Sequence, residues 1–72
     1  MNLRLNIGSY EFVEIASSGM PIAKFRPVSN DLFILEQQSH QAQKVLDYVS
    51  KTLQTPKSYI TIIPVHDLAE AK

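Results

Sequence analysis

The chain has 72 residues, of which 44% are hydrophobic and 19% are charged, so it is one small domain and too apolar for a disordered tail. Seven basic and seven acidic residues give a formal net charge of zero. This balance argues against non-specific nucleic-acid binding and against an anionic-membrane anchor, because both need a strong field of one sign. The absence of cysteine excludes a disulfide framework and a thiolate zinc site.

No segment has the length of a membrane span. The apolar run at residues 32–35 is among the longest, whereas a spanning helix needs about 20 apolar residues. Residues 1–7 lack the apolar region and the cleavage site of a signal peptide. We therefore expect a cytoplasmic protein that makes no membrane contact.

Two hairpins are predicted near the N-terminus. Apolar and polar residues alternate over residues 3–7, and the Gly-Ser pair that follows suits a two-residue type II′ turn, which would place Leu5 opposite Phe12. The Ser-Gly pair at 18–19 suits a second turn, which would place Phe12 opposite Phe25 and Ile15 opposite Ile22, on two different faces.

The segment 32–36 has two interpretations. After a turn at residues 28–31 it is apolar on all sides, which favours a fourth strand, with Ser39 as the N-cap of the following helix. In the alternative interpretation a helix begins at residues 29–31 and continues to about residue 54.

The helix before Pro56 has the clearest pattern. Its apolar residues recur at the spacing of one helical face, and the residue before a proline avoids helical geometry, so the helix ends near Thr55. Residues 59–63 are β-branched or aromatic and predict a last strand, which Pro64 places at a sheet edge or at its end.

These elements predict an α+β fold of two layers. An antiparallel sheet of four to five strands, in the order β-β-β-(β)-α-β, carries one helix on one face. Residues 1–66 form the single domain, and residues 67–72 form a frayed C-terminal tail.

Catalytic and metal sites are not expected. The groupings of His40 with its neighbours and of Ser58 with His66 and Asp67 lack a Gly-x-Ser-x-Gly elbow and an oxyanion donor. Together with Glu36, the histidines lack the close ligand spacing typical of zinc. We expect no cofactor, no metal and no small-molecule substrate.

The sheet face without a helix is the predicted functional surface. One helix covers one face only, so the other would expose an apolar patch with charged neighbours, as interfaces do. An exposed tyrosine on the helix is a further interface candidate. Two alternatives remain at this point, a register error of one residue and a sheet curled into a small barrel. The predicted partner-binding residues are Val13, Ile15, Ile22, Lys24, Arg26, Phe33, Leu35 and Tyr48.

The sequence predicts a non-catalytic protein-binding domain. We expect a small accessory subunit or inhibitor, of the kind that phages and plasmids encode, which docks on a larger protein or forms a dimer through a sheet face or edge. Nucleic acid is not an expected partner. An oligomeric enzyme with His40 or His66 at a subunit junction is an alternative.

A second alternative comes from residues 19–27. The run Gly-Met-Pro-Ile-Ala-Lys-Phe-Arg-Pro resembles the Gly-x-Pro-Val-Ala hairpin segment of the Phd/YefM antitoxin family. The resemblance implies a transcriptional regulatory module that binds DNA and a toxin. The chain departs from the family because a hairpin precedes this segment and a helix-strand unit follows it, so no functional residue is carried over.

Overall fold

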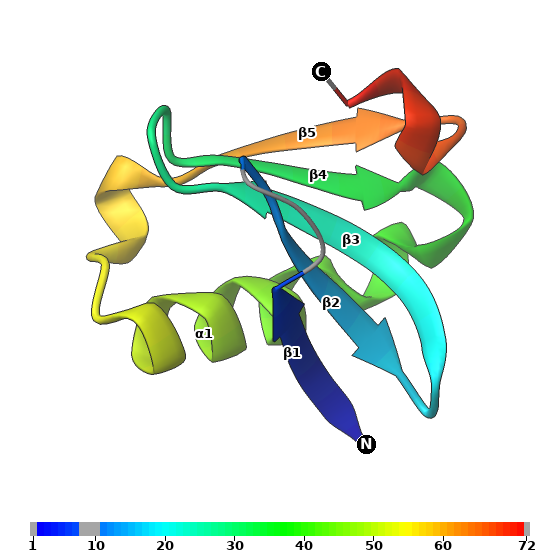
Figure 1. Cartoon of the computed structure of the whole chain (residues 1–72), viewed down its shortest axis with the longest axis horizontal. Helices are drawn as coiled ribbons and strands as arrows, with labels where there is room; N and C mark the ends of the chain where they lie inside the picture. Colours follow the sequence, from blue (N-terminus) through cyan, green and yellow to red (C-terminus); the bar gives the residue numbers. More distant parts are fainter. Residues whose placement is uncertain (1, 8–10, 72) are drawn as a thin grey trace.

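One α-helix lies across a five-stranded sheet in the computed structural model, which describes residues 2–7 and 11–71 (Figure 1). The order β-β-β-β-α-β confirms the predicted α+β fold, and residues 31–35 form a strand and not the start of the helix. The elements are β1 (Leu3–Ile7), β2 (Val13–Ser17), β3 (Met20–Arg26), β4 (Asp31–Leu35), α1 (Ala42–Leu53) and β5 (Thr61–Val65).

The sheet is mixed, whereas the sequence predicts an antiparallel one. The strands lie in the order β1-β2-β3-β4-β5, and among residues 2–7 and 11–71 only the β4–β5 pair is parallel. The physical reason is the connection, because α1 carries the chain back to the end of the sheet where β4 begins, as a crossover helix does. Pro64 lies in β5 at the edge, where its missing N–H is tolerated.

The first hairpin differs from its prediction. Leu5 lies opposite Ile15, and Ile7 lies opposite Val13, so five residues separate the paired ends of the strands. The predicted Gly-Ser turn at 8–9 itself lies outside the described residues. The pairing differs from the predicted one by three residues, and an odd shift moves side chains to the other face. Leu5 therefore shares a face with Ile15, not with Phe12.

The second hairpin has the predicted turn and a different register. Ser18 and Gly19 both have positive φ, at 51° and 84°, as in a type I′ turn. Ser17 lies opposite Met20 as predicted, but a bulge beyond Ala16 brings Ile15 opposite Ala23. One extra residue in β3 thus reverses the face of every later side chain in that strand.

The core lies between α1 and the sheet. Three helix residues, Val45, Leu46 and Val49, pack against the sheet, and Phe25 is the largest fully buried side chain. The sheet and the approach to β5 contribute the remaining buried members of this cluster: Ile15, Ile22, Ala23, Leu32, Ile34 and Ile60.

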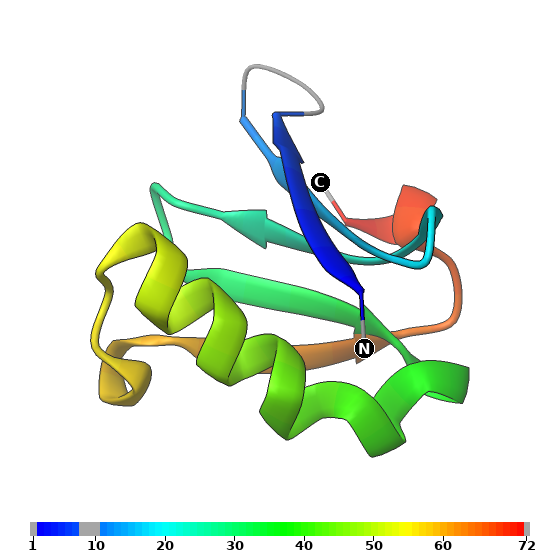
Figure 2. The same ribbon diagram turned by 90° about the horizontal axis from the view of Figure 1, so that it is seen from below.

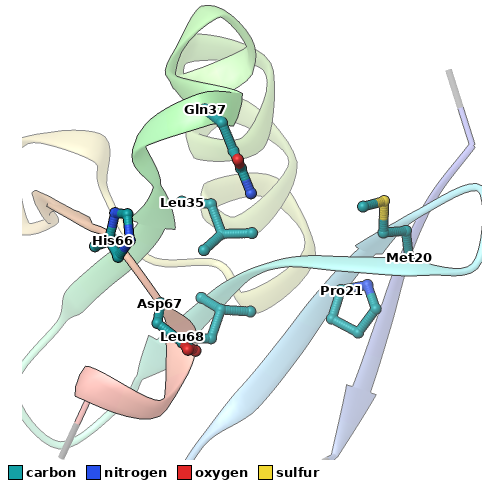
Figure 3. A pocket seen from close by; sticks show the side chains of 7 residues that line it. All are labelled: Met20, Pro21, Leu35, Gln37, His66, Asp67 and Leu68. Atoms are coloured by element: carbon teal, nitrogen blue, oxygen red, sulfur yellow. The ribbon is translucent and has the colours of Figure 1, made fainter.

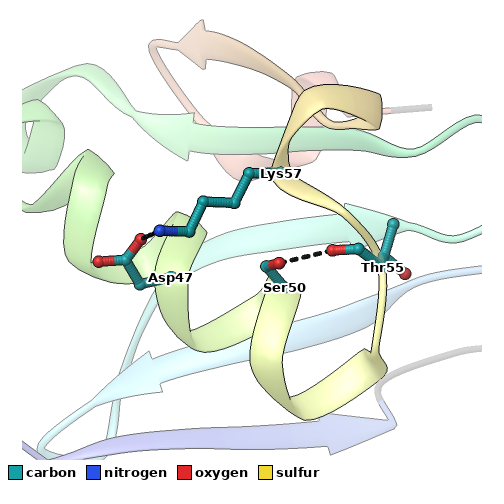
Figure 4. A network of polar contacts seen from close by, with 4 residues as sticks. All are labelled: Asp47, Ser50, Thr55 and Lys57. Carbon is teal, nitrogen blue, oxygen red and sulfur yellow. Dashed lines mark hydrogen bonds and ion pairs between the residues drawn. The ribbon is translucent and has the colours of Figure 1, made fainter.

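Short turns mark both ends of α1. A 3₁₀ helix at Glu36–Gln41 precedes α1. No side chain caps the first turn of α1, so the prediction of Ser39 as its N-cap is wrong. At the other end, Gln54 is left-handed at φ 54°, and the Ser50 hydroxyl donates to the Thr55 carbonyl at 2.5 Å (Figure 4). No helix in the described part of the chain has the length and apolar character that crossing a membrane requires.

An ion pair joins α1 to the short 3₁₀ helix at Lys57–Tyr59, which precedes β5. The Lys57 ammonium contacts the Asp47 carboxylate, and both side chains are more than half exposed (Figure 4). Exposed pairs of this kind contribute about 0–1 kcal/mol, because water screens them. The pair therefore orients the loop after α1 without dominating stability.

Residues 67–71 fold onto the sheet and do not form the frayed tail that the sequence predicts. The Asp67 carboxylate accepts from the Ala69 amide at 3.0 Å, and the Asp67 amide donates to Glu70 at 2.8 Å, which completes a capping box. Ala71 is only 7% exposed. This C-terminal turn (residues 67–71) lies on the side of the sheet away from α1, against β3 and β4 (Figure 2).

Candidate functional site

A row of side chains crosses the sheet on the side away from α1. Each is the register partner of the next, from β1 to β5 in order. None of these side chains is buried, so α1 and the C-terminal turn leave this row accessible. The row consists of Asn6, Glu14, Lys24, Phe33 and Ile63.

Two aromatic rings meet at the centre of this surface. Phe12, just before β2, lies edge-on to Phe33 with ring centroids 6.2 Å apart and an angle of 64° between the rings. This is the favourable T-shaped arrangement, because the positive ring edge meets the negative ring face. The accessible surface is hereafter called the open face, with the members Phe12, Glu14, Lys24, Arg26, Phe33 and Ile63.

Two cations lie close to the same ring. The Lys24 Nζ is 5.4 Å and the Arg26 guanidinium carbon is 6.0 Å from the centroid of Phe12. A cation over an aromatic face contributes about 0.5–1 kcal/mol at an exposed site. Phe12 thus holds both long side chains on the open face and arranges two positive charges around an apolar centre.

Acidic residues alternate with these cations. Lys24 lies opposite Glu14 across β2–β3, and Arg26 lies opposite Asp31 across β3–β4. Cross-strand pairs of opposite sign stabilise a sheet by roughly 0.2–1 kcal/mol. The open face is therefore apolar towards β5, with Phe33 and Ile63, and of mixed sign towards β2.

A shallow pocket of about 420 Å³ lies beside the open face, between the C-terminal turn and β3 (Figure 3). Leu35 and Leu68 point into it from one side, and Met20, which is 54% exposed, stands at its opposite rim. His66 and Asp67 line it as well, but Asp67 is engaged in the capping box. The pocket is a mainly apolar depression next to a folded turn.

The residues considered for catalysis do not converge. Ser58 lies before β5 and His66 lies after it, so they stand at opposite ends of a strand that is about 16 Å long at roughly 3.3 Å per residue. His40 lies in the 3₁₀ helix before α1. Among residues 2–7 and 11–71, no group of three His, Asp or Glu side chains is placed to hold a metal ion.

The predicted binding residues fall into three places. Val13, Ile15 and Ile22 belong to the side that faces α1, and Ile15 and Ile22 are 0% and 1% exposed, so their predicted exposure is wrong. The cause is the register described above. Tyr48 is half-buried against the core cluster.

The other predicted residues share the opposite side of the sheet. Lys24, Arg26 and Phe33 lie on the open face. Leu35 is buried at 8% exposure where it lines the pocket. Whether these residues bind a partner stays a prediction.

Sequence reasoning missed three members of the open face, which are Phe12, Glu14 and Ile63. The predicted register pairs Phe12 with Phe25, and Ile63 belongs to the predicted last strand without a binding role, yet both lie on the accessible side. The feature that could have placed Phe12 correctly is the length of the β1–β2 connection. It has five residues and not the predicted two, and this odd difference moves Phe12 to the face opposite the predicted one. Ile62 and Ile63 point to opposite faces of the sheet, but the sequence does not show which of them is on the accessible face. Only the parallel pairing with β4 decides this.

Comparison with known proteins gives no relative: no family model matches the chain, and no curated protein and no solved structure matches it. The segment at 19–27, which resembles the antitoxin hairpin, forms the β2–β3 turn and β3. Its apolar residues Ile22, Ala23 and Phe25 are buried in the core, so packing accounts for them.

Proposed function

We propose that this chain is a non-catalytic protein-binding domain, a small cytoplasmic accessory subunit or inhibitor that docks through the open face. The observation that carries the proposal is the Phe12–Phe33 pair, which lies partly exposed with two cations and two carboxylates around it. An apolar centre with a charged rim is the arrangement of a typical protein interface. Aromatic and arginine side chains are the residue types that most often dominate binding energy there.

The mixed charge favours a protein over a nucleic acid as the partner. Aromatic rings with Lys and Arg also suit single-stranded nucleic acid, on which bases stack. However, Glu14 and Asp31 lie directly beside the two cations, and the whole chain has no net charge. A polyanion would meet two carboxylates at the place where it needs a positive field.

The test is affinity capture with two charge-matched variants. Ile63→Arg places a long cation on the apolar part of the open face, and Gln43→Arg adds the same charge to an exposed position of α1. Each full-length variant is immobilised and exposed to lysate of the cells that encode it, and bound proteins are quantified by mass spectrometry. We expect a partner that binds wild type and Gln43→Arg within about twofold and loses about tenfold or more on Ile63→Arg, since one buried misplaced charge costs more than 1.4 kcal/mol.

Two outcomes contradict the proposal. In the first, no protein distinguishes Ile63→Arg from Gln43→Arg while circular dichroism shows that both variants are folded. In the second, the chain retains single-stranded DNA or RNA in a gel-shift assay at physiological salt. This result assigns nucleic-acid binding to the open face in place of protein binding.

A further inference from the structure

The outer edge of β1 presents unpaired backbone groups in a defined pattern. The Ser18 amide donates to the Asn2 carbonyl at 2.9 Å, which makes these two residues a hydrogen-bonded antiparallel pair. Such pairs alternate along a ladder, so the backbones of Arg4 and Asn6 also face β2. The N–H and C=O groups of residues 3, 5 and 7 therefore point outward, and no backbone hydrogen bond between described residues reaches them.

The two edges of the sheet differ in protection. β5 contains Pro64, which cannot donate and makes that edge a poor template for another strand. β1 has no proline and one charged residue, Arg4, and lies at the far end of the sheet beyond β2 (Figure 1). Leu5 is only half-buried even though it points to the side of α1, because no strand among the described residues lies beyond it.

We propose that β1 pairs with β1 of a second copy of this chain, antiparallel, around a two-fold axis at Leu5. Antiparallel pairing of identical strands is two-fold symmetric by geometry, which is the commonest symmetry of protein dimers. The five-stranded sheets of the two copies then join into one continuous sheet. This inference goes beyond the proposed function, because the edge and the open face are different surfaces.

One register satisfies the whole edge. With Leu5 opposite Leu5 of the second copy, Leu3 lies opposite Ile7, and all six outward groups of each strand form hydrogen bonds with those of the other. A shift by two residues leaves part of these groups unpaired, and in one direction it places the two Arg4 side chains directly opposite each other. A shift by one residue places the outward backbone groups of one strand opposite inward backbone groups of the other, so they cannot form hydrogen bonds. It also places apolar side chains opposite polar ones.

The side chains agree with this register. Arg4 lies opposite Asn6 of the second copy, so no like charges meet directly. Leu5 contacts Leu5 of the second copy on the side of α1, which extends the apolar layer and covers a half-exposed side chain. The self-complementary strand identifies a second copy as the occupant. Because only one strand forms the contact, the dimer is of the weak, small-interface class, with a dissociation constant in the micromolar range or above.

Sedimentation equilibrium of the full chain, up to about 1 mM, tests the proposal. The expected mass rises with concentration from the 8.1 kDa monomer to twice that value. Asn6→Lys opposes a lysine to Arg4 of the other copy at two symmetric places, which weakens the dimer by about 2- to 30-fold. Arg4→Glu combined with Asn6→Lys opposes unlike charges and restores the dimer, while Gln43→Lys on α1 leaves the constant unchanged.

A second variant acts on the backbone. Leu5→Pro removes an outward N–H without removing a bond to β2, so it abolishes dimerisation and leaves the monomer folded by circular dichroism. A chain that stays monomeric at about 1 mM overturns the proposal. A dimer that neither Asn6→Lys nor Leu5→Pro weakens also overturns it, and neither result bears on capture of a partner by the open face.

Discussion

Replacement of Ile15 by alanine tests which side of the sheet is the core. Ile15 is 0% exposed and lies beneath α1, whereas Ile63 is half-exposed on the open face. Truncation of a fully buried isoleucine costs about 2–5 kcal/mol, because the transfer energy is lost and a cavity remains. A domain of this size has a total stability of about 4–11 kcal/mol, so Ile15→Ala removes a large part of it. Ile63→Ala is the matched control and costs about 1 kcal/mol.

Urea and thermal unfolding followed by circular dichroism measure both variants. For Ile15→Ala we expect a melting temperature lowered by roughly 8–40 °C, since each kcal/mol shifts a small domain by about 4–8 °C. Ile63→Ala is expected to shift it by less than about 8 °C. The register predicted from the sequence exposes Ile15 and therefore predicts a small loss for Ile15→Ala. An equal or larger loss for Ile63→Ala refutes the assignment of the two faces.

Three further variants test local features. Gln54→Gly relieves a left-handed residue at φ 54° and raises stability by about 0.5–1 kcal/mol in thermal unfolding, whereas a decrease contradicts the C-cap. Asp67→Ala removes the capping box, costs about 1 kcal/mol and accelerates hydrogen exchange at the Ala69 amide, and unchanged exchange at that amide argues against a folded C-terminal turn. Phe12→Leu keeps an apolar side chain but removes the ring beside two cations, and a cost of roughly 0.5–2 kcal/mol in urea unfolding is expected; a neutral result removes the cation–π contribution.

Local sequence patterns were sufficient to predict where the helix, a turn and a strand of the fold lie. The 3.6-residue period located α1, and Pro56 limited its end to within two residues of Leu53. The Ser-Gly pair at 18–19 located a turn in which both residues have positive φ. The apolar run at 32–35 indicated β4, because it lacks a helical period. Each of these signals depends on a few neighbouring residues.

The candidate site was predicted only in part. Lys24, Arg26 and Phe33 were placed on one surface from the sequence, and they do share it. Ile15 and Ile22 were placed there as well, but they are in the core. The reason is the register between β2 and β3: the bulge places Ile22 and Lys24 of one strand on different faces, and it brings Ile15 opposite Ala23 in the core.

The short, neutral, cysteine-free sequence by itself determined an α+β domain with one helix and no surplus of charge. The tertiary structure decided which sheet face that helix covers. A bulge beyond Ala16 and a loop of five residues each change the register by an odd number, and each change exchanges the core for the surface. The packing energy of the whole sheet determines such irregularities. A window of a few residues in the sequence does not contain that information.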